Sequence, residues 1–321
     1  MRKVSAVILL GFGAFLLVGA ILLKWYAYPR LAVAPLDQDI VQVSSGPDAE
    51  IFDQGELRNR TTDLTATRRV IGDVAASEEE GNNVVVSNTS VTTVDADGVV
   101  VDAITARVPF DRTSGAAVNC CDANLNDQPI EFHGQVLKFP FNTQQRDYDF
   151  WDNDLKQATP AVFSGEESIN GVTVYTFVQT IEPTMIGAVN APPNLVGASG
   201  TAFVPTDRFY SNIRTLWVEP ETGFIINGQE QQYSTLRYQG EDRLVLTDVT
   251  IGYTDATVED NTDTYGPKAT QLKIMRVWGP IVGSIVGVLM ILVGLLLSWR
   301  MRPAPAENED EAGDLELSEQ T

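Results

Sequence analysis

The chain has 321 residues, of which 43 are acidic and 22 are basic, and its formal net charge is −21. This charge repels phosphate backbones, so nucleic-acid binding is excluded as a function. One histidine and two adjacent cysteines provide no His/Cys ligand cluster, so we expect no zinc or other metal site and no cofactor.

A membrane helix is predicted at residues 4–23, after the short basic start at residues 1–3. The run from Val4 to Leu23 is apolar and, at about 1.5 Å per residue, spans roughly the 30 Å of a hydrocarbon core. It is longer than the apolar region of a signal peptide, and the Ala-x-Ala site that follows it, at residues 32–34, precedes a proline. We therefore expect an uncleaved anchor.

Residues 24–276 are expected to form one large, mostly antiparallel β domain. Apolar residues alternate around residues 84–108, with Asp97-Gly98 as the turn of a hairpin. A second hairpin is indicated around Asn170-Gly171 and a third around residues 219–223. Helical periodicity is scarce in this segment, so we expect only small helices, located in loops.

Cys120 and Cys121 are adjacent and leave three alternatives open. A disulfide between neighbours would form a strained ring and would stiffen the turn at residues 119–122. Two reduced, partly buried thiols and an interchain disulfide are the other interpretations. A disulfide framework that joins distant strands is excluded, because there are no further cysteines.

Aromatic and acidic residues alternate at residues 147–154. One interpretation is a strand with its aromatic side chains inward and its acids outward; the other is the rim of a ligand or cation site, formed by Tyr148, Phe150 and Trp151. His133 has no catalytic partner that the sequence identifies, and neither a nucleophile motif nor a phosphate-binding glycine loop is present. We therefore predict that the protein is not an enzyme.

A second membrane helix is predicted at residues 277–299, with Trp278 and Trp299 at the two interfaces. Small residues recur along this helix and would let helices approach closely, either within one chain or in a homo-oligomer. The glycines expected to pack are Gly279, Gly283 and Gly287. Residues 300–321 are acidic and are expected to form a disordered tail.

The basic start favours a two-pass topology in the plasma membrane. In this topology residues 1–3 and 300–321 are cytoplasmic, and the β domain lies outside the cytoplasm. Flanking charges around both helices nearly cancel, so charge alone does not determine the orientation.

Three stretches resemble an actinobacterial envelope family of PorA type: residues 137–152, residues 171–177 and residues 216–223. The resemblance covers nearly the whole chain, including the two terminal helices. It implies an actinobacterial plasma membrane and a domain that faces the cell wall. The layout alone is also similar to that of the class B scavenger receptors, which pass lipids through an internal tunnel, but an architecture does not carry a function with it.

The leading functional hypothesis is that the β domain binds or relays an apolar envelope lipid, which predicts a long apolar cavity. A structural or interaction module of an envelope complex is the second hypothesis. The third is a porin or channel component, which requires an oligomer with a polar lumen. A bilayer β-barrel is disfavoured, because such a barrel needs an apolar outer face and lacks long hydrophobic helices.

Overall fold

The computed structural model describes residues 2–299, so the predicted tail at residues 300–321 and the first residue lie outside it. The chain divides into two compact units. One contains the residues up to 27 and those from 275 onward, and the other contains residues 28–274. Each unit is described separately below.

The first unit is a pair of apolar helices. It is formed by α1 (Arg2–Leu22), the π-helical turn η1 (Leu23–Ala27), most of a second π-helical turn, η3 (Ile274–Trp278), and α5 (Gly279–Trp299). The described chain has two helical segments long and apolar enough to cross a membrane, at Val4–Leu31 and Asp255–Trp299.

Small side chains form the contact between α1 and α5. Ala6, Gly13 and Ala20, spaced seven apart, are buried on α1. On α5 the buried positions are Gly287 and Gly294. A Cβ atom built on Gly287 would lie only 2.8 Å from the Gly13 carbonyl oxygen, so the backbones approach to a distance that only glycine allows.

The second unit is built on a single antiparallel sheet of 12 strands, which confirms the predicted fold class. The strand order is β6-β5-β4-β3-β2-β1-β12-β11-β10-β9-β8-β7, so almost every neighbour in sequence is a neighbour in the sheet. The strands are β1 (Asp39–Asp53), β2 (Arg58–Gly72), β3 (Val84–Val94), β4 (Val100–Asp111), β5 (Asn124–Leu125), β6 (Gln128–Pro129), β7 (Tyr148–Asp152), β8 (Gln157–Ile169), β9 (Val172–Ala191), β10 (Val204–Glu219), β11 (Phe224–Tyr238) and β12 (Glu241–Tyr253).

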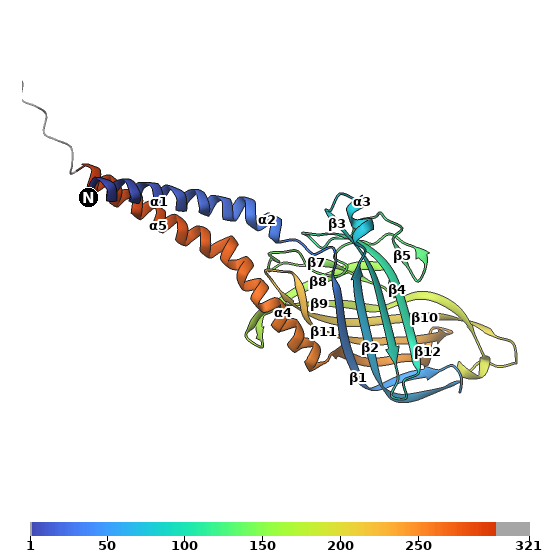
Figure 1. The fold of residues 1–321 in the computed structure, drawn as a ribbon. Helices are drawn as coiled ribbons and strands as arrows, with labels where there is room; N and C mark the ends of the chain where they lie inside the picture. Colours follow the sequence, from blue (N-terminus) through green and yellow to red (C-terminus); the bar gives the residue numbers. More distant parts are fainter. Residues whose placement is uncertain (1, 300–321) are drawn as a thin grey trace, which may run out of the picture. The chain divides into compact units, whose positions relative to one another are not determined.

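The sheet folds over into two crossing layers. In Figure 1, strands β1 to β4 run across β9 to β12, and the fold between the layers lies where β1 meets β12. The register of β1 shifts between Gly46 and Ala49, and Asp48 there has a φ of 51°. Such a bulge bends a strand sharply, which lets one continuous sheet supply both layers.

Two short segments join β4 to β7, the strand at one edge of this sheet. Ala117 bridges to Phe110 of β4, Ala116 bridges to Gln135, and Gln135 bridges to Phe150 of β7. The Gln135 backbone makes two hydrogen bonds, donating to Asp149 O at 2.7 Å and accepting from Trp151 N at 2.8 Å. The backbone pairing therefore closes on itself at this end of the domain.

Gly134 makes this closure possible. Its φ is +67°, and a Cβ atom at this position would lie 2.5 Å from the Asp149 carbonyl oxygen. Any other residue would push β7 away from the joining segment.

One long helix was not predicted in the β domain. α4 (Asp255–Lys273) is capped by Thr254, whose side chain accepts a hydrogen bond from Thr257 N. The Tyr265 ring stacks on Phe224 at 3.5 Å between centroids, and Asn261 donates to the Ile226 carbonyl oxygen of β11. α4 is mostly polar with few apolar contacts, so its sequence shows little helical periodicity and the prediction of only small helices was wrong. The other helices of this unit are short: α2 (Tyr28–Leu31), α3 (Val74–Glu79) and the 3₁₀ turn η2 (Pro193–Leu195).

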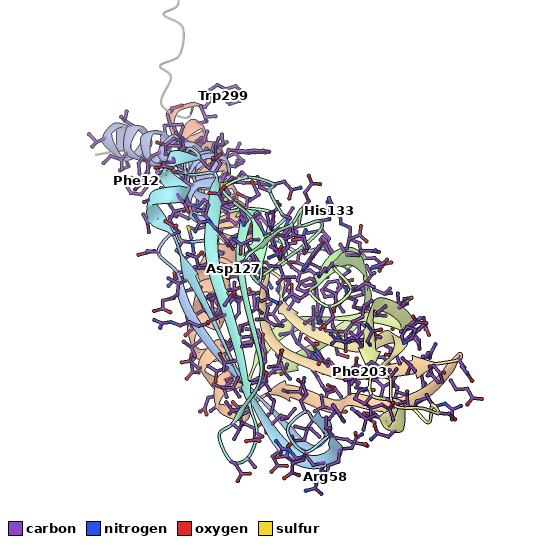
Figure 2. All side chains as sticks on the ribbon, turned by 90° about the vertical axis from the view of Figure 1, so that its right-hand side faces the viewer. Phe12, Arg58, Asp127, His133, Phe203 and Trp299 are labelled. Carbon is purple, nitrogen blue, oxygen red and sulfur yellow. A yellow bond between two sulfur atoms is a disulfide. The ribbon has the colours of Figure 1, made fainter. Side chains whose placement is uncertain are left out.

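Two ring side chains labelled in Figure 2, Phe203 and His133, lie on the surface of the β domain. Phe203, on the connection between β9 and β10, is 65% exposed. His133 is also exposed, next to the buried Phe132, and its ring centroid lies 6.5 Å from that of Trp151.

Candidate functional site

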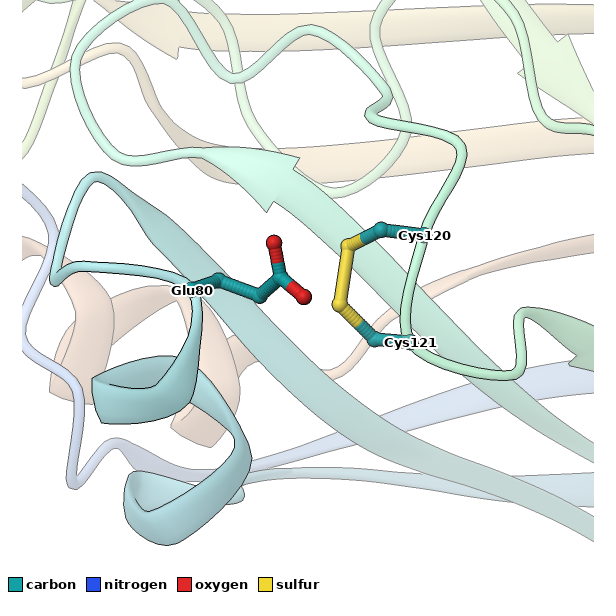
Figure 3. A group of neighbouring side chains, drawn as sticks. All are labelled: Glu80, Cys120 and Cys121. Carbon is teal, nitrogen blue, oxygen red and sulfur yellow. A yellow bond between two sulfur atoms is a disulfide. The ribbon is translucent and has the colours of Figure 1, made fainter.

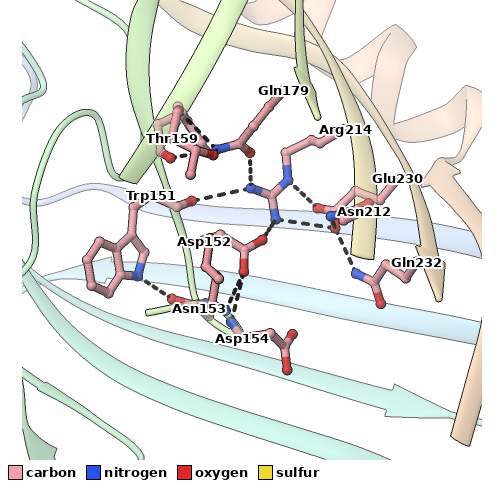
Figure 4. Close-up of polar contacts among 12 residues, drawn as sticks. Trp151, Asp152, Asn153, Asp154, Thr159, Gln179, Asn212, Arg214, Glu230 and Gln232 are labelled. Atoms are coloured by element: carbon pink, nitrogen blue, oxygen red, sulfur yellow. Dashed lines mark hydrogen bonds and ion pairs between the residues drawn. The ribbon is translucent and has the colours of Figure 1, made fainter. Parts of the chain in front are cut away.

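The most unusual feature of the β domain is a set of charged and amide side chains inside it. We call Asp152, Gln179, Asn212, Arg214 and Glu230 the buried network; they are shown in Figure 4. Four come from the neighbouring strands β9, β10 and β11, and Asp152 from the end of β7.

Arg214 is the centre of the buried network. It pairs in register with Glu230 across β10 and β11, and its Nε lies 2.8 Å from Glu230 Oε1. Its Nη2 lies 3.0 Å from Asp152 Oδ2. The Arg214 side chain is only 11% exposed and that of Asp152 is 1% exposed, so this ion pair is shielded from water, whereas the Glu230 side chain is 27% exposed.

Gln179 links the network to the backbone of the edge strands. Its Oε1 accepts from Arg214 Nη1 at 2.7 Å, while its Nε2 donates to the Phe150 carbonyl oxygen at 2.6 Å. The same Nε2 lies 2.9 Å from Thr159 Oγ1 on β8. Strands β7, β8, β9 and β10 are therefore held together through one amide group.

The charges of the network control its protonation. Burial alone would raise the pKa of Glu230, but the charge and hydrogen bonds of Arg214 outweigh burial and lower that pKa to about 2. Burial opposes the charged form of Arg214, yet Glu230 and Asp152 raise its pKa above the usual value. Both groups are thus ionised at every physiological pH.

Asn212 leaves one acceptor unsatisfied. Its Nδ2 donates to Glu230 Oε2 at 2.9 Å, whereas its Oδ1 is buried without a hydrogen-bond partner. A buried polar atom without a partner costs about 1–3 kcal/mol. The Asn212 Oδ1 atom is thus able to accept a hydrogen bond from a further donor.

A second set of charges, the outer group, is coupled to the network and is more exposed. It consists of Asp102 on β4, Asp154 after β7, and Arg208 on β10, whose Nη2 lies 3.6 Å from Asp154 Oδ1. Burial, reinforced by the charge of Asp152, raises the pKa of Asp154 to about 6. Burial also raises the pKa of Asp102, against the opposing charge of Arg208. The two groups together carry four carboxyls against two guanidinium groups.

The predicted ligand rim does not lie at a surface. Tyr148 and Phe150 are buried and pack with Phe139 and Phe177, with the rings of Phe139 and Phe177 stacked at 4.6 Å. Trp151 points to the other face of β7 and packs edge-on against Phe132. Both faces of β7 are covered because this strand lies beside the closure, so its aromatic side chains form core contacts and not a rim.

The sequence pointed to only part of this site. Asp152 and Asp154 were noted in the acidic segment, but Arg214, Glu230 and Gln179 were missed. The usable signal is alternation in β10: Tyr210, Leu216 and Val218 are buried at even positions, so an arginine at 214 is on the inward face. The cysteines lie elsewhere: of the three alternatives, the structure contains the disulfide between Cys120 and Cys121.

Of the three glycines predicted to pack, Gly283 and Gly287 contact α1 and Gly279 lies at the start of α5. Gly287 is buried against Gly13, and a Cβ atom at Gly283 would be in ordinary contact with Ala20 at 3.5 Å. Gly279 is half-buried at the start of α5. Gly294, the other buried glycine of this helix, would bring a Cβ atom to 2.9 Å from Leu10.

The chain combines an antiparallel β domain with two helical segments that are long and apolar enough to cross a membrane. A family model described as Porin PorA matches residues 5–296, and the chain belongs to this family.

Two curated relatives are both named Porin PorA. The protein from Corynebacterium amycolatum is 25% identical over 300 residues, covering 73% of this chain and 78% of the relative. The protein from Corynebacterium resistens is 22% identical over 408 residues, covering 95% and 98%. A solved structure from Bacteroides fragilis with a YmcC-like fold is 14% identical and covers 69% of this chain and 96% of its own. Its TM-score of 0.22 is too low to support any argument.

Proposed function

We propose that the protein is a channel component of the cell envelope that passes small cations through the charged interior of its β domain. The observation that carries the proposal is the buried network, in which Arg214, Asp152 and Glu230 lie inside a sheet that closes on itself. The relatives' name, Porin PorA, supports the same class of function.

The sign of the charge supports cations as the permeant species. Carboxyls outnumber guanidinium groups in the buried network and outer group together. The whole chain has a net charge of −21, which concentrates cations at its surface. Rings of carboxylates are a common means of cation selection in channels.

The outer face of the sheet is polar, which supports a β domain that lies in water and not in the lipid bilayer. On β2, the outward positions Asp63, Thr65, Thr67 and Arg69 are all exposed. A strand that faced hydrocarbon would need apolar residues there. The membrane would therefore be crossed by α1 and α5, with several copies of the chain around one pore, in the plasma membrane and with the β domain outside.

The interior gives no support to the lipid-relay hypothesis. An acyl chain in the middle of the domain would lie against Arg214, Asp152 and Glu230 without offering them hydrogen bonds. Burying charges in this way costs several kcal/mol per ion.

The test is conductance of the purified full-length protein in a planar phospholipid bilayer. We expect discrete current steps and a reversal potential that favours K⁺ over Cl⁻ in a salt gradient. Asp154→Asn should weaken this preference, whereas Asp207→Asn, an exposed outward position on the same face as Phe209 in β10, should not.

Two results would refute the proposal. One is the absence of current steps from protein shown to be inserted in the bilayer. The other is a stoichiometric, solvent-extractable lipid in native mass spectra of the same preparation together with a silent bilayer, which would favour lipid relay.

A further inference from the structure

A second chemical site lies far in sequence from the buried network, at the disulfide of Cys120 and Cys121. The Glu80 carboxylate points at this disulfide, as Figure 3 shows. One ligand atom from each of the three residues lies within 4.8 Å of the other two. Both cysteines are partly buried and Glu80 is exposed, so reagents in solution can reach the group.

The position of Cys121 is fixed by an arginine. Arg107 of β4 donates from Nε to the Cys121 carbonyl oxygen at 2.8 Å and from Nη2 to Asp73 Oδ2 at 3.0 Å. Asp73 in turn caps α3, accepting a hydrogen bond from Ala76 N. Glu80 follows the last residue of α3 and its backbone N–H donates to the Ala76 carbonyl oxygen.

These contacts connect the two halves of the site. Arg107 holds both the turn at Cys121, through the Cys121 carbonyl oxygen, and the start of the helix that Glu80 follows, through Asp73. The disulfide joins the two sulfur atoms, and the braced backbone keeps the Glu80 carboxylate close to them.

We propose that this group is a redox-gated site for a thiophilic divalent cation such as Zn²⁺. With the disulfide formed, neither sulfur is a thiolate, and the site has only the Glu80 carboxylate to offer. After reduction, two thiolates and one carboxylate provide the three protein ligands of an open zinc site, with water as the fourth ligand.

A dithiol can reduce the disulfide between Cys120 and Cys121 by thiol–disulfide exchange. Two electrons and two protons pass from the dithiol to the protein disulfide, which becomes two thiols, while the dithiol becomes a disulfide. When Zn²⁺ binds, the two thiols of Cys120 and Cys121 release their protons to solvent. Three groups that are negative when deprotonated repel one another at this distance, and a cation between them removes that repulsion.

The site is separate from the proposed channel path and does not depend on it. Its local surface also favours cations, since Glu78, Glu79 and Asp122 are exposed next to it in sequence. Charge of this kind raises the local concentration of a divalent cation but does not select one; the two sulfurs provide the selection.

The test is Zn²⁺ titration by calorimetry of the full-length protein in detergent, before and after reduction with dithiothreitol and removal of the reductant under nitrogen. We expect one Zn²⁺ per reduced chain, with an affinity at least about tenfold above that of the oxidised chain and of Cys120→Ser/Cys121→Ser. Glu80→Gln should weaken binding by about tenfold or more, and Glu79→Gln, which removes the same charge from the neighbouring exposed position, should weaken it far less. Cd²⁺ added to the reduced chain should give the ultraviolet charge-transfer band of cadmium–thiolate bonds.

Three results would overturn the assignment. The first is a disulfide that remains intact in excess dithiothreitol, as measured by the mass increase after thiol alkylation. The second is Zn²⁺ affinity that is equal in the oxidised and reduced chains. The third is equal affinity of the reduced Glu80→Gln and Glu79→Gln proteins, which would remove the carboxylate from the ligand set.

Discussion

Replacement of Arg214 by methionine tests whether the buried network acts as one unit. Methionine keeps an unbranched apolar stem of similar length, so the main change is the loss of the guanidinium group. That group contacts Asp152, Glu230 and Gln179, and also the Trp151 carbonyl oxygen at 3.3 Å. The variant leaves two carboxylates facing each other without a cation.

We expect a loss of about 3–5 kcal/mol in the free energy of unfolding, the usual cost of removing one partner from a buried ion pair. The contacts of Arg214 to Asp152, Glu230 and Gln179 would each be worth about 1–3 kcal/mol, but they share one guanidinium group and do not add. The loss should be smaller at low pH, because protonation of Glu230 removes its repulsion with Asp152.

The assay is equilibrium urea denaturation of the full-length protein in detergent, followed by tryptophan fluorescence. The matched control is Arg208→Met, also on β10, where the side chain is 42% exposed and its ion pair with Asp154 is 3.6 Å long. An exposed pair of this kind contributes about 0–1 kcal/mol. If Arg214→Met costs no more than Arg208→Met, the network does not act as a buried unit.

Three further predictions concern protonation and packing. The pKa of Glu230 is about 2 in the folded state and 4.5 in the unfolded chain, so the folded protein loses stability as pH falls from 4.5 to about 2. In acid denaturation, Glu230→Gln should remove about 3 kcal/mol of this pH-dependent change in the free energy of unfolding. Burial, opposed by the charge of Asp111, lowers the pKa of Lys138 from 10.5 to about 7, so the free energy of unfolding should rise with pH between these values. The slope is at most about 1.4 kcal/mol per pH unit, and Lys138→Met should lack it in urea denaturation at pH 7, 8 and 9. Gly287→Ile should destabilise the helix pair by about 1–3 kcal/mol and lower its melting temperature in detergent, whereas Val288→Ile, on an exposed position, should not.

The fold class was predictable because the signals for it are local. Asp97-Gly98 and Asn170-Gly171 lie at the turns between β3 and β4 and between β8 and β9, where their sequence places them. The two apolar helices were predictable for the same reason, since twenty consecutive apolar residues need no tertiary contact to be recognised.

The closure of the sheet was not predictable, because it depends on contacts between distant segments. Gln135 lies in irregular chain, and its two bridges, to Ala116 and to Phe150, leave no periodic pattern in the sequence. The same contacts explain why Tyr148, Phe150 and Trp151 are core residues, as in the interpretation with the aromatic side chains inward, and do not form a rim. A strand with one covered face alternates aromatic and polar residues, but β7 has both faces covered.

The buried network raises the question of why a core should contain charge at all. An ion pair such as Arg214 with Asp152 and Glu230 is a weak source of net stability, because desolvation offsets most of the attraction. Apolar side chains of similar volume would fill the same space at little or no cost, as they do around Phe139 and Phe177 in the neighbouring cluster. The packing of the domain therefore gives no reason for two carboxylates, one guanidinium group and the unsatisfied Asn212 oxygen in one place. A function that needs water or cations in that interior does give such a reason. The decisive comparison is thus whether variants that neutralise the interior alter ion selectivity before they alter stability.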